Sequence, residues 1–160
     1  MANIHDYLLW RGDIKLSEEH PFNEVDSLIL ARLSYLPFDK VDIKEKETIK
    51  ELSKRLINLD EKDFLYNGDK ELAIFVGKSS RFNNLLVTDF VKIDDKETEK
   101  QFGAITVHLP NDELYVSYLG TDKTINGWKE DFNMAFMDNV PCQISGLEYL
   151  ESISKKYNDK

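Results

Sequence analysis

The sequence is poor in residues that cross-link or interrupt a chain: of its 160 residues, one is cysteine, four are proline and seven are glycine. The single cysteine, Cys142, has no partner for an intrachain disulfide, which is typical of proteins in a reducing compartment. No apolar run reaches transmembrane length, and the first residues lack the basic segment and apolar run of a signal peptide. We therefore expect a cytoplasmic protein without a transmembrane segment.

Basic residues are also scarce relative to acidic ones. The chain has 21 Lys and Arg against 30 Asp and Glu, for a net charge of −9. Because nucleic-acid phosphates require clustered basic side chains, the composition argues against a nucleic-acid partner. The sequence also lacks metal-ligand spacing and glycine-rich phosphate loops, so we predict no metal and no cofactor.

Apolar residues are present in the amount that a folded domain needs. Hydrophobic residues make up 41% of the chain and aromatic residues 11%, values typical of globular proteins. The chain is long enough to bury a core. We expect residues 1–160 to form a single domain.

The first half of the chain predicts helices. Apolar residues at helical spacing begin at Glu24 and end before Pro37, and the same spacing recurs over residues 44–59 and 69–76. Residues 4–10 are apolar but short, and either a helical turn or an edge strand fits them.

The second half predicts a sheet. Residues 85–93, 102–109 and 114–119 are rich in β-branched and aromatic residues and predict three strands in an antiparallel meander. Helices are predicted near 128–137 and over 144–157. The order of these elements indicates an α/β fold, or an α+β fold if the chain is truncated.

The turn after the third strand is the candidate site. Gly120 permits a backbone conformation that other residues avoid, and Thr121 offers an N–H and a hydroxyl to a developing negative oxygen. A plain turn is the alternative, because Gly, Thr and Asp are common turn residues.

This segment resembles part of the class 3 lipases. The matching text is Tyr118-Leu119-Gly120-Thr121, then Gly127-Trp128 and Asp131-Phe132. The Phe22–Asp26 helix start is similar to an uncharacterised bacterial family of lipase-like α/β-hydrolases. The resemblance implies the N-terminal part of such a hydrolase.

The resemblance also implies roles for individual residues. Thr121, with Gly120, matches the oxyanion hole, and Trp128 lies in the segment that corresponds to the lid. Asp131 matches the carboxylate that supports this region. Leu119 departs from the pattern, because the family usually has Arg there.

The catalytic residues of that family are absent from the sequence. No Gly-x-Ser-x-Gly occurs, and none of His5, His20 and His108 lies where the triad histidine is expected. We identify no catalytic residue. We expect hydrolase ancestry, with acyl esters as substrates of a complete enzyme, but no activity from these 160 residues. The alternative is a non-catalytic binding or interaction protein derived from that fold.

Two kinds of partner follow from this interpretation. An acyl-ester or lipid ligand fits the hydrolase resemblance. An incomplete sheet leaves an open edge and uncovered apolar surface, which favours association. We therefore predict self-association through the sheet edge or through the helix over 144–157.

Overall fold

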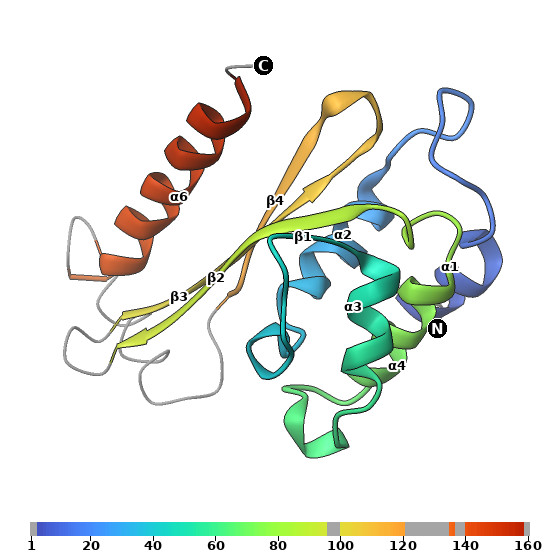
Figure 1. The fold of residues 1–160 in the computed structure, drawn as a ribbon, viewed down its shortest axis with the longest axis horizontal. Coiled ribbons are helices and arrows are strands. Elements are labelled where there is room, and N and C mark those ends of the chain that lie inside the picture. Colours follow the sequence, from blue (N-terminus) through green and yellow to red (C-terminus); the bar gives the residue numbers. More distant parts are fainter. Residues whose placement is uncertain (1–2, 96–99, 121–134, 137–139, 159–160) are drawn as a thin grey trace. The chain divides into compact units, whose positions relative to one another are not determined.

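The computed structural model describes residues 3–95, 100–120, 135–136 and 140–158. They form an α+β fold with a four-stranded antiparallel sheet in the order β1-β2-β3-β4 (Figure 1). The helices are α1 (Ile4–Arg11), α2 (Glu24–Leu33), α3 (Ile49–Leu56), α4 (Asp69–Lys78) and α6 (Pro141–Asn158). The strands are β1 (Lys46–Thr48), β2 (Leu86–Asp95), β3 (Lys100–His108) and β4 (Leu114–Tyr118). The α+β class confirms the sequence prediction.

The chain divides into two compact units. The first contains Met1–Phe90 and Ile105–Ser117, and the second contains Val91–Ala104 and Tyr118–Lys160. The strands β2, β3 and β4 each contribute residues to both units.

Three helices of the first unit begin with a capping box that is visible in the sequence. Asn3, Asn23 and Thr48 are the N-caps of α1, α2 and α3, and each side chain accepts a backbone N–H from the first turn. In each case an acidic residue three positions later accepts the backbone N–H of the cap. These reciprocal bonds satisfy groups that a helix end leaves unpaired, and so they fix where each helix starts.

The core of the first unit is formed by helices α1 to α4 and the strand residues that face them. Its buried side chains are mainly leucine, isoleucine, valine and phenylalanine. They include Leu8 of α1, Ile29, Leu30 and Leu33 of α2, Leu52 and Leu56 of α3, Leu72 and Val76 of α4, and Val87, Ile105 and Val107 of the strands. Their burial supplies the main favourable free energy of this unit.

The structure corrects the predicted helix over residues 44–59. Lys46–Thr48 pair with β2 in antiparallel register, Lys46 opposite Thr88 and Thr48 opposite Leu86, and the helix begins only at Ile49. Glu47 is buried in this strand, where Arg55 and the N–H of Lys44 bond its carboxylate. Strand pairing and this ion pair override the local helical pattern.

The other predicted elements that lie within the described residues are confirmed. Residues 4–10, which the sequence left open, are the helix α1. The predicted helix near 128–137 lies mostly outside the described residues, and residues 135–136 form a turn. Pro141 opens α6, so Cys142 lies in the first turn of this helix.

In the second unit, α6 packs on an aromatic cluster. Phe102 of β3, Tyr118 of β4 and Tyr149 of α6 lie with their ring centroids 6.0–6.1 Å apart. The Tyr118 hydroxyl donates to the carbonyl of Gly146 at 2.9 Å. Burial raises the pKa of Tyr118. These contacts hold α6 against β3 and β4, and Tyr149 and Ile153 of α6 are buried.

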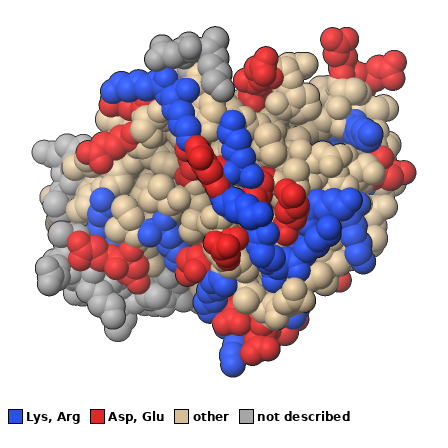
Figure 2. All heavy atoms as spheres, in the orientation of Figure 1, with Lys and Arg blue, Asp and Glu red and all other residues tan. Residues whose placement is uncertain are grey.

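Charges of both signs share the surface. On the face drawn in Figure 2, acidic and basic side chains of the described residues are interspersed. Within the described ranges, no helix has both the length and the apolar character to cross a membrane.

Candidate functional site

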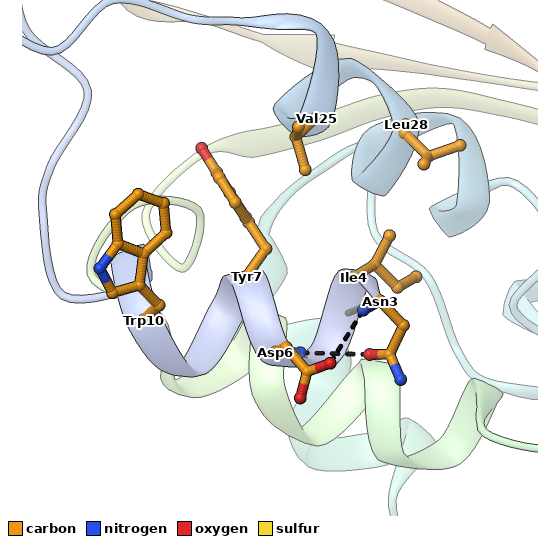
Figure 3. Close-up of a pocket in the computed structure, with 7 residues that line it drawn as sticks. All are labelled: Asn3, Ile4, Asp6, Tyr7, Trp10, Val25 and Leu28. Atoms are coloured by element: carbon orange, nitrogen blue, oxygen red, sulfur yellow. Dashed lines mark hydrogen bonds between the residues drawn. The ribbon is translucent and has the colours of Figure 1, made fainter. Parts of the chain in front are cut away.

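An apolar groove lies between α1 and α2 in the first unit. Its volume is about 560 Å³, and it is lined by Asn3, Ile4, Asp6, Tyr7, Trp10, Val25 and Leu28. Figure 3 shows Tyr7 and Trp10 projecting from α1 on the side of Val25 and Leu28 of α2. Trp10 is 72% exposed and Leu28 is 57% exposed. Two large apolar side chains in a surface groove are the most distinctive feature of this unit.

Helical spacing produces the α1 wall of the groove. Ile4, Tyr7 and Trp10 recur at intervals of three, so they lie along one side of the helix. The rings of Tyr7 and Trp10 pack edge to face with centroids 6.2 Å apart. Leu8 points instead into the core, where it is 6% exposed. The helix therefore divides its apolar residues between the core and the groove.

The polar end of the groove is the capping box of α1. Asn3 Oδ1 accepts the N–H groups of His5 and Asp6, and Asp6 Oδ2 accepts the N–H of Asn3 at 2.8 Å. Both side chains thus hold the helix start while they line the groove (Figure 3). Asp6 is exposed and contributes a negative charge there.

Tyr7 connects the groove to a buried polar network. Its ring lines the groove, and its hydroxyl donates to Asp26 Oδ1 at 2.9 Å and accepts from Asn23 Nδ2 at 2.9 Å. Asp26 also accepts the N–H of Asn23 and forms an ion pair with Arg81. The Tyr7 ring is therefore anchored to α2 as well as to its own helix.

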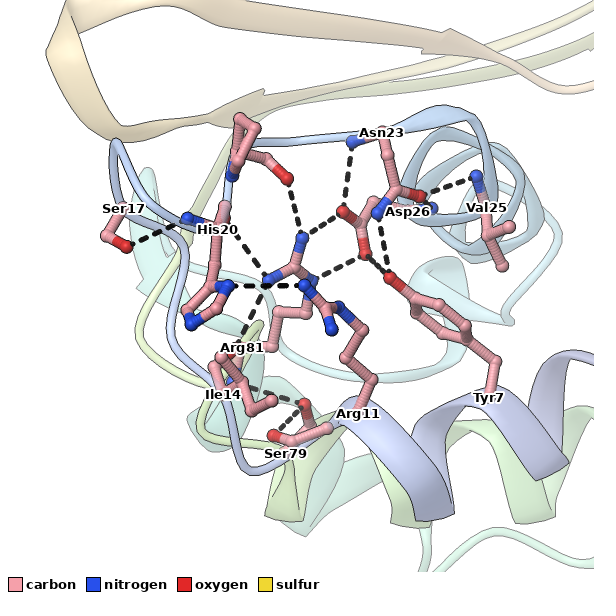
Figure 4. A network of polar contacts seen from close by, with 12 residues as sticks. Tyr7, Arg11, Ile14, Ser17, His20, Asn23, Val25, Asp26, Ser79 and Arg81 are labelled. Atoms are coloured by element: carbon pink, nitrogen blue, oxygen red, sulfur yellow. Dashed lines mark hydrogen bonds and ion pairs between the residues drawn. The ribbon is translucent and has the colours of Figure 1, made fainter.

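Arg81 is the centre of this network (Figure 4). Its side chain is fully buried and forms two bonds with the Asp26 carboxylate, from Nε at 2.7 Å and from Nη2 at 2.5 Å. Its remaining N–H groups donate to the carbonyls of Ile14, His20 and Pro21. The bond to Asp26 raises the pKa of Arg81 above its ordinary value. The network holds the segment that connects α1 to α2, and it therefore fixes the positions of the two helices that line the groove.

A second ion pair joins α2 to α4. Arg32 of α2 donates from Nη2 to Asp69 of α4 at 2.6 Å. Its guanidinium lies 4.3 Å from the ring centroid of Tyr66 and 5.0 Å from that of Tyr35. Burial raises the pKa of Asp69, and the charge of Arg32 opposes that rise. The ion pair and the contacts of Arg32 with the two rings together hold α2 against α4.

Of the four candidate residues from the sequence, the structure describes Gly120 alone. Thr121, Trp128 and Asp131 lie outside the described residues. Gly120 is exposed and lies two positions after the end of β4 at Tyr118. Across the residues that the structure describes, no group of three or more His, Cys, Asp or Glu could hold a metal ion.

The comparison with protein families gives one match. The model of the family described as Mbeg1-like matches residues 76–160, just over half of the chain. The chain belongs to the Mbeg1-like family. No curated protein and no solved structure matches it.

This match corrects the resemblance drawn from the sequence. The identification as the N-terminal part of a class 3 lipase-like α/β-hydrolase was wrong, because the family that matches is Mbeg1-like. The match begins at Val76, inside α4, so the Phe22–Asp26 helix start quoted for the resemblance lies outside it.

The groove also lies outside the Mbeg1-like match, and sequence reasoning missed it. Leu8 and Leu9 are neighbours of the same type, yet Leu8 is buried and Leu9 is 70% exposed. Periodicity shows which residues share a side of a helix, but it does not show which side is covered. The spacing of Ile4, Tyr7 and Trp10 was the available signal, and residues 4–10 were too few to interpret it.

Proposed function

We propose that this chain is a non-catalytic binding module whose α1–α2 groove receives an apolar part of its ligand. The observation that carries the proposal is the exposure of Trp10 and Leu28 in one groove. Covering apolar surface is favourable by about 25 cal/mol per Å². Apolar patches bordered by polar residues are typical of interaction sites.

The rigidity of the groove supports binding. Tyr7 is held by Asp26 and Asn23, and Asp26 is held in turn by the buried Arg81. A side chain that is already fixed loses little conformational freedom when a ligand arrives, so more of the contact free energy appears as affinity. The single cysteine, Cys142, supports the further proposal that this binding takes place in the cytoplasm.

Nile red, a neutral dye whose emission rises in apolar surroundings, tests the groove. We expect its emission to rise with the unaltered chain and to fall by more than half with Trp10→Ala and with Leu28→Ser. Amide shifts in a ¹H–¹⁵N spectrum should concentrate on α1 and α2. Leu9→Ala is the matched control, because Leu9 is 70% exposed on α1 but does not line the groove. Equal emission from all variants would contradict the proposal.

We also propose weak self-association through α6. Ile144, Leu147 and Leu150 recur at intervals of three and are 49%, 60% and 48% exposed. They form an apolar stripe on the helix that buries Tyr149 and Ile153. A stable dimer buries about 800 Å² per partner, which is more than three side chains supply. We therefore propose a weak contact between two copies, which forms to a greater extent as the protein concentration rises.

Light scattering over a concentration series tests this contact. The apparent mass of the unaltered chain is expected to rise with concentration, and Leu147→Glu should keep it at the monomer value because a charge enters the stripe. Leu9→Glu places the same charge on a similarly exposed position of α1 and should leave the rise unchanged. A monomer at all concentrations would remove this proposal.

A further inference from the structure

Resting on the proposed function, we infer that the occupant of the α1–α2 groove is an amphipathic helix of a partner protein whose apolar stripe is flanked by lysine or arginine. The groove assigns both properties: its walls set the shape of the occupant, and Asp6 sets its charge.

Two helices form the walls of the groove. Ile4, Tyr7 and Trp10 make a ridge along α1, and Val25 and Leu28 make a shorter ridge on α2 (Figure 3). A third helix fits beside two such ridges by placing its own apolar residues between them. Trp10 supplies the large aromatic contact that commonly dominates the affinity of such interfaces. A helix with apolar residues at i, i+3, i+4 and i+7 matches this surface.

The charge of the groove favours a basic partner. Asp6 is the acidic residue of the lining, and Glu24, next to Val25, is exposed. The chain as a whole carries a net charge of −9. Arg11, the basic neighbour of Trp10, bonds His20 at 3.2 Å, and its guanidinium lies 5.7 Å from the centroid of the Trp10 ring. A cationic helix is therefore attracted at the Asp6 end of the groove, whereas an anionic helix or a fatty acid carboxylate is repelled there.

Labelled peptides of leucine and lysine test the inference by fluorescence anisotropy with the full chain. The peptide with leucines at helical spacing should bind at least about tenfold more tightly than a scrambled peptide of the same composition. It should also bind more tightly than an analogue in which glutamate replaces lysine. Trp10→Ala should weaken binding at least about tenfold. Asp6→Asn keeps an oxygen that can accept the N–H of Asn3, and should weaken the lysine peptide about two- to fivefold while reducing its salt dependence.

Matched variants separate specific from general attraction. Leu9 and Asp42 are exposed residues of the same types as Leu28 and Asp6, but they do not line the groove. Leu9→Ala and Asp42→Asn should therefore change the affinity for the lysine peptide by no more than about twofold. The inference is overturned if the scrambled or glutamate peptide binds equally well, or if Asp42→Asn acts like Asp6→Asn.

Leu28→Ser provides a second groove variant should Trp10→Ala lose its folded spectrum. If Nile red or a neutral acyl probe occupies the groove and the peptides do not, this inference fails and the proposed function stands. If no probe shifts the groove amides, both fail.

Discussion

Replacing Asp26 with alanine is expected to lower the free energy of unfolding by about 3–5 kcal/mol, because the change leaves the Arg81 guanidinium buried without its counter-charge. Both side chains are fully buried in the structure. The Tyr7 hydroxyl and the N–H of Asn23 lose their acceptor at the same time. Denaturant unfolding monitored by circular dichroism measures the change.

A paired replacement and a surface ion pair serve as controls. The double variant Asp26→Leu with Arg81→Met removes both charges, and should cost less than the sum of the single changes. Lys40→Ala breaks the more exposed ion pair with Asp63 and should cost at most about 1 kcal/mol. If Asp26→Ala lowered the free energy of unfolding no more than Lys40→Ala does, the buried network would not stabilise the first unit.

Replacing Gly77 with alanine is expected to destabilise the chain by about 1–3 kcal/mol through overpacking. Gly77 lies in α4, and a β-carbon there would lie 2.4 Å from Cβ and 2.6 Å from Oγ of Ser53 on α3. The nearest atom, a β-carbon, moves only with its helix, so α3 and α4 would have to separate. The melting temperature and the denaturant midpoint should both fall.

Two further variants isolate the steric cause. Ser53→Gly removes the opposing β-carbon and should recover part of the loss when combined with Gly77→Ala. Gly146→Ala makes the same change in α6, where the new β-carbon would be 3.8 Å from Cε1 of Tyr118, an ordinary contact. Helix propensity favours alanine there by up to about 1 kcal/mol, so this control should be neutral or stabilising. Equal destabilisation by Gly77→Ala and Gly146→Ala would exclude close packing of α3 and α4 as the reason.

The sequence predicted the elements whose signals are local. The apolar spacing from Glu24 predicted the start of α2, and in the structure the capping box of Asn23 and Asp26 holds that start. The predicted strands over 85–93 and 102–109 likewise match β2 and β3 to within a few residues at each end, because β-branched residues favour extended backbone. The α+β class followed from the order of these elements.

Tertiary structure decided everything that depends on contacts between distant residues. Lys46–Thr48 became a strand because β2 supplies its backbone hydrogen bonds, although the local pattern favoured a helix. Asp26 and Arg81 are 55 positions apart in sequence, and folding alone makes them a buried pair. Outside residues 4–10 and 46–48, composition and periodicity indicated which of the described segments form helices and strands. Which apolar side chains become core and which remain exposed in the groove, Leu8 against Trp10, was decided by packing, because burial depends on what the rest of the chain places beside each helix.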